Sequence, residues 1–519
     1  MRQTVRLSLP ALLATLGLAS ACDAPVDHGT SMAPAEPLAT PLPGEWPTFK
    51  RDLAHTGLAV ELKGGLTHDA RCLRWSRRLT FDKARNAASP VVAKVAGRWT
   101  VFQVTQGTCR GDQTDCIADG GTVYALDGAN GVILWKRETP FPLDPYAPAI
   151  ADVDRDGNRE LLVPANAPGG NVVYAVRTEP ADVAGELLWT ATYDAGFLSE
   201  GAPVALNVDP SDDALEVLLG TASNGDQAAA RFYAFSGKDG SIRGAPFEAS
   251  RRSVEDARCE GGDKLDSSSP SVAWVDGAWT IYVGSWGGKF YGLEWADGGL
   301  RARYTHDLPR FNGAAEDCSL RKVRSGAAIG QIVPGGDPEV VFGYMTEPRA
   351  LAPQGDFSST RLRIVNANGL ATIADLELTD WKSSPSLGEL DAASPGLEIV
   401  GGRVKGVYST NLQPRWNHDL GDGDFDNNNT AGNRASPAIA DVDGDGKLDV
   451  VMGIEGKQQP GIVVLDGQSG ELKWGFEIPA PGLASSPIVA DIDGDGQLEI
   501  VFWGFDGVLY ALDNEACQP

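Results

Sequence analysis

One pattern recurs eight times along this chain, at a spacing of roughly 50 to 65 residues. Its first half is a small residue followed by proline, an apolar strand, an acidic loop and a second apolar strand. Its second half reads Gly-x-Val/Leu-Tyr-Ala-Leu-Asp, then a glycine turn and often a strand with tryptophan. Two such hairpins make a four-stranded blade, so the repeat predicts an all-β propeller and argues against a helical solenoid.

The copies predict both the number of blades and how the ring closes. Their first halves begin near Ser89, Ala147, Ala202, Ser269, Gly326, Ser384, Ser436 and Ser486, so we expect an eight-bladed β-propeller. The eighth copy ends before its outer strand, whereas the segment 73–79, with Trp75, precedes the first copy as an outer strand without a blade. Pairing of these N-terminal and C-terminal strands would close the ring and hide two sheet edges.

The N-terminus has the pattern of an export signal over residues 1–21. Arg2 and Arg6 precede the apolar run 7–18, and small residues at 19–21 form a cleavage site. Cys22 follows directly, and the segment Leu-Ala-Ser-Ala-Cys that ends there resembles a bacterial lipobox. The resemblance implies lipidation of Cys22. Ala occupies the position where lipoboxes usually have Leu, so ordinary cleavage that merely exposes Cys22 stays open.

The next segment, 22–45, is rich in Pro, Ala, Thr and Ser without an apolar period, which predicts a lipidated disordered tether. The propeller is expected over 46–519. No other segment approaches about 20 continuous apolar residues, so we expect membrane contact through the lipid anchor only. The predicted location is the bacterial cell envelope, with the leaflet and the side left open.

The six remaining cysteines suggest disulfides in an exported protein. Cys72 would enter the first strand where Cys517 leaves its partner strand, and Cys109 and Cys116 bracket a short loop. Cys259 and Cys318 then remain for each other. Six cysteines allow other pairings, which stay open.

The formal net charge is -26 with a pI near 4.6, and no basic stripe interrupts it. Such a charge would repel a phosphate backbone, so we expect no nucleic-acid partner. Much of the acidity is concentrated in aspartate-rich loops, which favours cation binding.

Three loops share the pattern Asp-x-Asp-x-Asp-Gly-x-x-Asp/Glu, which is typical of calcium binding. Alternate carboxylates converge on a tight turn, Gly permits that turn, the seventh residue supplies a backbone carbonyl, and the ninth completes the ligand shell. Oxygen ligands without His or Cys argue against zinc or copper. The predicted structural calcium ligands are Asp152, Asp154, Asp156, Asn158 and Glu160; Asp441, Asp443, Asp445, Lys447 and Asp449; and Asp491, Asp493, Asp495, Gln497 and Glu499.

Asp-Gly loops are also common hairpin turns, but three copies at the same place in the repeat favour a metal. Two further loops, around Asp209 and Asp391, keep only part of the pattern, and we assign no metal there. The run 422–428 has alternating acids without a following strand, so a metal site and a plain polar loop are equally compatible with it.

The acidic loops resemble those of FG-GAP or VCBS repeats, whereas the VYALD-x-x-x-G-x-x-x-W pattern resembles PQQ-like (quinoprotein-type) repeats. The segment 46–57, WPTFKRDLAHTG, resembles the one that opens many PQQ-like propellers. The resemblance implies a propeller around a central channel. Quinone enzymes of that family use a disulfide between adjacent cysteines, and no two cysteines are adjacent here, so no PQQ is expected.

The resemblance is closer to non-catalytic scaffold lipoproteins, and repeat motifs specify fold better than function. We therefore predict no enzyme but a monomeric, calcium-stabilised binding or scaffold module, whose partner is an envelope protein or glycan. The alternatives are a calcium-dependent polysaccharide-active enzyme of the lyase kind, because some eight-bladed lyases have similar loops, and an adhesin or sensor. The five histidines form no metal-spaced set, and no Gly-x-Ser-x-Gly motif is present.

Overall fold

The structure is a computed structural model, and every regular element of its described residues is a β-strand. The all-β prediction is therefore confirmed for this part of the chain. The described residues are 41–66, 73–80, 88–106, 120–141, 143, 147–167, 170–193, 201–211, 213–221, 229–249, 265, 268–309, 320–323, 325–347, 359–378, 383–401, 406–408, 412–416, 435–454, 461–479, 483 and 485–513.

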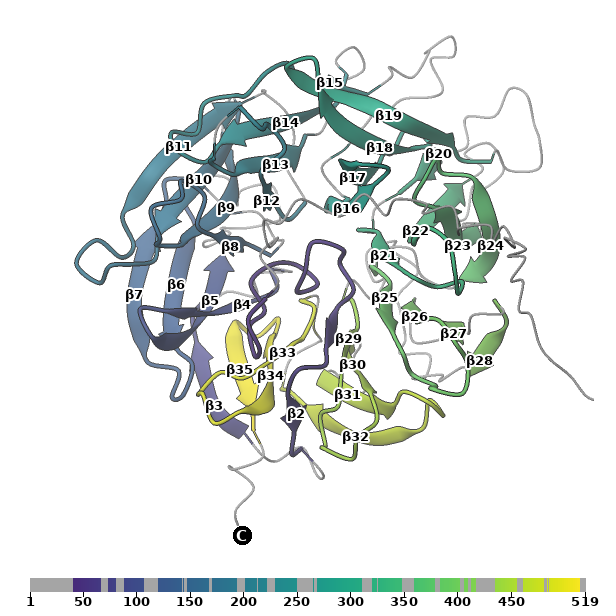
Figure 1. Ribbon diagram of the computed structural model, residues 1–519. Coiled ribbons are helices and arrows are strands. Elements are labelled where there is room, and N and C mark those ends of the chain that lie inside the picture. The colour runs from purple at the N-terminus through teal and green to yellow at the C-terminus, as the bar shows by residue number, and fades with distance from the viewer. Residues whose placement is uncertain are drawn as a thin grey trace, which may run out of the picture.

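The strands pair into eight sheets, which follow one another around a central axis, as expected for a propeller (Figure 1). We number them in chain order. Sheets 1 to 4 consist of β4 (Val91–Val95), β5 (Arg98–Thr105), β6 (Thr122–Asp127) and β7 (Ile133–Glu138); β8 (Ala149–Ala151), β9 (Glu160–Ala167), β10 (Gly170–Arg177) and β11 (Leu187–Tyr193); β12 (Val204–Leu206), β13 (Glu216–Gly220), β14 (Arg231–Ser236) and β15 (Phe247–Glu248); and β16 (Ser271–Val275), β17 (Ala278–Gly284), β18 (Lys289–Ala296) and β19 (Gly299–Asp307).

Sheets 5 to 8 continue the ring and take in the first three strands of the chain. They consist of β20 (Leu320–Lys322), β21 (Ala328–Gly330), β22 (Glu339–Glu347), β23 (Ser359–Asn366) and β24 (Thr372–Leu378); β25 (Ser386–Gly388), β26 (Glu398–Gly401), β27 (Gly406–Tyr408) and β28 (Pro414–Trp416); β29 (Ala438–Ala440), β30 (Asp449–Ile454), β31 (Gly461–Asp466) and β32 (Leu472–Glu477) with β1 (Leu58–Ala59); and β33 (Ile488–Ala490), β34 (Gln497–Trp503) and β35 (Val508–Leu512) with β2 (Lys63–Gly64) and β3 (Leu73–Arg78).

The ring closes where the first outer strand joins the last sheet. Strand β3 pairs antiparallel with β35, with Trp75 opposite Ala511 and Ser76 opposite Tyr510. This pairing was predicted from the missing outer strand of the last repeat and is confirmed. It gives β35 a partner on the side that would otherwise be an open sheet edge.

The core lies between neighbouring sheets. The middle strands of a blade are covered on both faces, so they read as nearly continuous apolar runs, and β34 ends in the fully buried Phe502 and Trp503. The outer strands face solvent on one side and alternate instead; β32, for example, alternates exposed with more buried residues. The change from continuous to alternating hydrophobicity therefore marks the position of each strand in its blade.

The tryptophan of the outer strand joins its sheet to the next sheet along the chain. The indole N–H of Trp416 donates to the carbonyl oxygen of Gly467 at 3.0 Å, and Gly470 packs against the ring. Equivalent bonds run from Trp75 to Gly128, at 2.6 Å, and from Trp189 to Gly237, at 2.7 Å. Packing of the tryptophans between blades explains why Gly-x-x-Gly recurs in the turn after Ala-Leu-Asp.

The small-residue/Pro steps of the repeat form a ring of hydrogen bonds around the axis. Where the step has a serine, its hydroxyl accepts the backbone N–H of the equivalent residue in the preceding sheet. The bonds run from Ala202 to Ser269, Gly326 to Ser384, Ser384 to Ser436, Ser436 to Ser486 and Ser486 to Ser89, at 2.8–3.0 Å. Five sheets thus use the same small side chain to hold the sheet before them.

Residues 44–57, which we call the axial segment, cross the centre of the ring (Figure 1). The innermost strand of each blade would otherwise leave backbone N–H groups unpaired on its inner edge. The carbonyl oxygens of Gly44, Trp46, Pro47, Leu53, Ala54, Thr56 and Gly57 accept hydrogen bonds of 2.7–3.1 Å from Asp491, Val92, Ile150, Val272, Ile329, Leu387 and Ile439. One short segment therefore binds seven of the eight sheets, and Phe49 packs against Ala202 of the remaining one.

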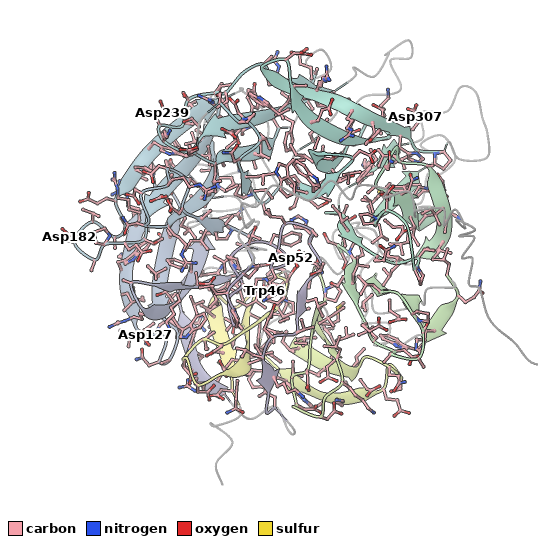
Figure 2. The ribbon with its side chains drawn as sticks, viewed as in Figure 1. Trp46, Asp52, Asp127, Asp182, Asp239 and Asp307 are labelled. Carbon is pink, nitrogen blue, oxygen red and sulfur yellow. The ribbon has the colours of Figure 1, made fainter. Side chains whose placement is uncertain are left out.

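The axial segment begins earlier than the sequence suggests. Gly44 and Glu45, which the prediction assigned to the disordered tether, are part of the body, and Glu45 is buried. Its Oε1 atom lies 2.9 Å from Nη1 of Arg159 and accepts the backbone N–H of Lys94 at 2.9 Å. Figure 2 labels Trp46 and Asp52 close to the centre of the ring.

Candidate metal centres

The three predicted calcium-binding segments lie at equivalent places, between the first and second strands of their sheets. Loop 152–160 leads from β8 into β9, loop 441–449 from β29 into β30, and loop 491–499 from β33 into β34. Each first strand is buried and lies beside the axis. The loops therefore project from a rigid part of the fold.

Each loop is folded by its own aspartates. In loop 152–160, Asp152 Oδ2 accepts the N–H of Gly157 at 3.1 Å, Asp154 Oδ1 that of Asp156 at 3.1 Å, and Asp156 Oδ1 that of Asn158 at 2.7 Å. Gly157 has a φ of 94°, which an L side chain would strain. The other two loops repeat all three hydrogen bonds.

The ninth residue closes each loop from the buried side. Glu160, Asp449 and Glu499 begin or lie in the second strand and are almost completely buried. One oxygen of each accepts the N–H of the second loop residue, at distances of 2.8–3.3 Å. The other oxygen of Glu499, Oε1, has no hydrogen-bond partner, whereas that of Asp449, Oδ1, lies 2.7 Å from Nζ of Lys473.

The carboxylates at positions one, three and nine converge in every loop. In each of the groups Asp152/Asp154/Glu160, Asp441/Asp443/Asp449 and Asp491/Asp493/Glu499, one oxygen per residue lies within 4.8 Å of the others. The fifth-position aspartates, Asp156, Asp445 and Asp495, are exposed and lie outside these groups. Asn158, Lys447 and Gln497 are at the seventh position, where the prediction requires only their backbone carbonyl.

Burial makes the ionised form of these carboxylates costly unless a cation is present. Desolvation, with repulsion from the other acids of the loop, raises the pKa of Glu160 to about 8 and that of Glu499 to about 10. Desolvation also raises the pKa of Asp449, to about 7, although Lys473 opposes the shift. A bound divalent cation would favour the charged form of all three residues.

Unpartnered oxygens in these loops are compatible with a cation, and the partial loop around Asp391 shares the feature at Glu398 Oε1. Asp152 Oδ1, Asp441 Oδ1 and Glu499 Oε1 are buried and have no hydrogen-bond partner. A buried oxygen without a partner costs free energy unless it coordinates something. Because the converging atoms are all carboxylate oxygens on a flexible turn, the donor set fits calcium better than zinc or copper.

Sequence reasoning missed the basic residues that face these loops. Lys473 contacts loop 441–449, with its Nζ atom 2.7 Å from Asp443 Oδ2, and Arg74 contacts loop 491–499, with Nη1 2.7 Å from Asp493 Oδ2. Both residues immediately precede the outer-strand tryptophan of their sheet. The corresponding residue of the sheet with loop 152–160 is Leu188. The position directly before the outer-strand tryptophan was the sequence signal that could have identified Lys473 and Arg74.

The two loops that keep only part of the acidic pattern have a similar arrangement. Asp391 Oδ2 lies 2.5 Å from Nη2 of Arg415, and Asp209 Oδ2 lies 2.6 Å from Nη2 of Arg243. Arg415 precedes the tryptophan of sheet 6, and Arg243 follows the equivalent glycine turn of sheet 3. An arginine therefore neutralises the retained aspartate in both.

Several predicted sites lie outside the described residues. These are the lipidation site Cys22, the disulfide candidates Cys72, Cys517, Cys109, Cys116, Cys259 and Cys318, and the acidic run 422–428. Their pairing and modification stay predictions. Within the described part of the chain, no helix is long and apolar enough to cross a membrane.

Comparisons with known proteins agree with the repeat and the fold. Residues 441–502 match the family described as FG-GAP-like repeat, a span that holds loops 441–449 and 491–499 but not loop 152–160. No sequence among the curated proteins matches the chain.

Solved structures similar to this chain include enzymes and a matrix protein. A europium-containing methanol dehydrogenase has a TM-score of 0.59 at 12% identity over 89% of this chain and 90% of that chain. Quinohemoprotein alcohol dehydrogenase from Comamonas testosteroni has a TM-score of 0.55 at 12% identity, over 90% of this chain and 80% of that chain. The V. cholerae biofilm matrix protein Bap1 has a TM-score of 0.42 at 15% identity, over 86% of this chain and 91% of that chain. Similarity at these identities shows the fold alone.

Proposed function

We propose that this protein is a non-catalytic, calcium-stabilised propeller that presents a rigid disk to a protein or glycan of the bacterial cell envelope. The observation that carries the proposal is the axial segment. It fills the centre of the ring with the chain's own backbone and binds seven sheets through carbonyl oxygens. Propeller cofactors and substrates commonly bind near such a centre, so its occupation favours binding at the rim or on the loops.

The polar groups at the centre serve the fold. Lys50 is buried, and its Nζ atom donates to the carbonyl oxygen of Pro437 at 2.8 Å and also contacts Ser386 Oγ. His55 is fully buried beside Phe49, with ring centroids 5.4 Å apart. A buried lysine and histidine without solvent access are poorly placed to act on a substrate.

In this proposal the eight sheets act as eight blades, and calcium stabilises the acidic loops 152–160, 441–449 and 491–499. Without an ion, three converging carboxylates repel one another, and the turn they fold would open. The acidic rim, where Figure 2 shows Asp182, Asp239 and Asp307, favours a cationic or neutral partner. Lipid on Cys22 would hold the monomeric disk at the membrane, with no other membrane contact.

The test uses the mature chain purified from its own envelope. Mass spectrometry of its N-terminal peptide would identify a diacylated Cys22 if the anchor exists. The immobilised protein, with calcium or with chelator, is then exposed to envelope proteins and glycans, and any ligand is purified and titrated back. Saturable, stoichiometric binding by a purified ligand supports the scaffold. Calcium-dependent release of unsaturated products from acidic polysaccharides would instead establish the lyase-like alternative and overturn the proposal.

A further inference from the structure

Loop 441–449 already holds a cation of the protein itself. The Nζ atom of Lys473 lies 2.7 Å from Asp443 Oδ2, 2.7 Å from Asp449 Oδ1 and 3.5 Å from Asp445 Oδ2. Lys63 Nζ lies 3.3 Å from Asp441 Oδ2. All four carboxylates of this loop therefore have an ammonium group within 3.5 Å.

The ammonium group of Lys473 lies within the reach of the same carboxylates that would coordinate a calcium ion in this loop. Calcium lies 2.3–2.6 Å from each ligand oxygen, so an ion bound by these oxygens of the third and ninth loop residues would overlap with an atom that lies 2.7 Å from both. Asp449 is fully buried, and the Lys473 side chain is only 18% exposed. The contact is therefore shielded from water, and the ammonium and the ion cannot both be present.

Loop 152–160 has the same fold without such a cation. Its outer-strand residue before the tryptophan is Leu188, which cannot neutralise a carboxylate. In the part of the chain that the structure describes, no lysine or arginine forms an ion pair with Asp152, Asp154 or Glu160. Asp152 Oδ1 is buried there without a hydrogen-bond partner, as is Asp441 Oδ1 in loop 441–449, so the two loops differ in the ammonium group of Lys473 and not in this oxygen. This loop has an interior lined by carboxylates alone.

Loop 491–499 is intermediate between these two. Arg74 contacts one of its converging acids, Asp493, and it also pairs with Asp513, outside the loop. Glu499 Oε1 remains buried and unpartnered. Arg74 thus contacts the third residue of this loop, whereas Lys473 contacts both the third and the ninth residues of loop 441–449.

We propose that Lys473 takes the place of the metal in loop 441–449, so that exchangeable calcium is held by loops 152–160 and 491–499 alone. The residue before the outer-strand tryptophan then decides which acidic loops need a metal. The inference rests on the calcium binding assumed in the proposed function. It goes beyond it by assigning different roles to three loops whose sequences are nearly the same.

A reciprocal exchange between two sheets tests the assignment. Lys473→Leu gives loop 441–449 the residue found beside loop 152–160, and Leu188→Lys makes the opposite change. Calcium binding to the mature chain is measured by isothermal titration and equilibrium dialysis, with Ca²⁺ alone as the probe. We expect two sites in the wild type, one more in Lys473→Leu and one fewer in Leu188→Lys.

Lys447→Leu is the matched control. It removes a lysine from the same loop, but this side chain is exposed and the backbone carbonyl of residue 447 is kept. We expect the wild-type number of sites. A gain in this variant equal to that in Lys473→Leu would mean that general charge, and not occupation of the site, controls binding, and would overturn the inference.

The remaining outcomes separate the inference from the proposed function. Three equivalent sites in the wild type, unchanged in Lys473→Leu, would overturn the inference and leave calcium stabilisation intact. No binding to the wild type or to either exchange variant would overturn calcium binding itself. Because Leu188→Lys changes a different sheet, a folding defect of Lys473→Leu leaves the second half of the test valid; a wild-type number of sites in Leu188→Lys would also overturn the inference.

Discussion

The backbone N–H of Ser486 donates a 2.8 Å hydrogen bond to Oγ of Ser89, which lies 397 residues earlier in the chain. Both residues are buried. The same kind of hydrogen bond joins neighbouring sheets elsewhere in the ring. Here it joins the last repeat to the first. It can form only when the ring is closed, so it reports on closure separately from the pairing of β3 with β35.

Replacement of Ser89 by Ala should weaken the closed ring. The buried N–H of Ser486 would lose its acceptor, which typically costs about 1 to 3 kcal/mol of unfolding free energy. The measurement is the midpoint of denaturant unfolding with calcium present. An unchanged midpoint would show that the serine ring contributes nothing to stability.

Replacement of Gly470 by Ala should destabilise the protein through two effects. Gly470 has a φ of 74°, and a Cβ atom there would lie 2.4 Å from Cδ2 of Trp416. We expect a loss of about 2 to 4 kcal/mol, from backbone strain and overpacking together.

Gly369→Ala is the control for the backbone effect. Gly369 has a φ of 91°, and a Cβ atom there would meet nothing within 4 Å. This variant should lose only about 1 to 2 kcal/mol. Equal losses at Gly369 and Gly470 would contradict the packing of Gly470 against the tryptophan.

His55 should make the protein sensitive to acid. Burial, with the nearby Lys50, lowers its pKa to about 3, whereas the unfolded chain has a value near 6.5. Because the folded-state pKa is lowered, the neutral histidine contributes fully to the free energy of unfolding above pH 6.5. This contribution is lost as the pH falls toward 3. Between pH 7 and pH 5 the loss is about 2 kcal/mol.

His55→Asn removes that titration. The difference in unfolding free energy between pH 7 and pH 5 should be smaller in the variant, while packing effects are judged at pH 8, where histidine is neutral. Equal pH dependence in the two proteins would show that His55 does not remain neutral in the folded state.

Glu160→Gln should have opposite effects with and without calcium. Burial raises the pKa of Glu160 to about 8, so its contribution to the metal-free fold is present below about pH 4 and is lost as the pH rises through 8. At pH 8 with chelator, the neutral glutamine should therefore stabilise the protein, by about 4 kcal/mol. With calcium it removes a charged ligand and should lower the melting temperature. The same sign of change in both conditions would contradict metal binding in loop 152–160.

The fold was predictable from the sequence because its determinants are local. The glycine turn, Trp75 and the apolar runs each specify a strand or its place in a blade, and closure followed from one outer strand too few at one end and one too many at the other. The converging acids were predictable for the same reason, since a nine-residue pattern folds its own loop.

The axial segment and the role of Lys473 were not predictable. The axial segment binds through backbone carbonyls, which have no side-chain signature, so WPTFKRDLAHTG could be identified only by resemblance. Lys473 lies 24 residues after Asp449 in a different strand, and its proximity to the loop depends on how β32 pairs with β31. The place of Lys473 in the repeat suggests this contact only once it is known that loop 441–449 lies beside β32.

The position of the axial segment has a consequence for the order of folding. It is synthesised before every strand it binds, and its partners range from Val92 to Asp491. During synthesis, which proceeds from the N-terminus, it can gain partners only one sheet at a time, and β2 must wait for β34. The earliest part of the body is thus among the last to be fixed, and folding is dominated by distant contacts, which form slowly.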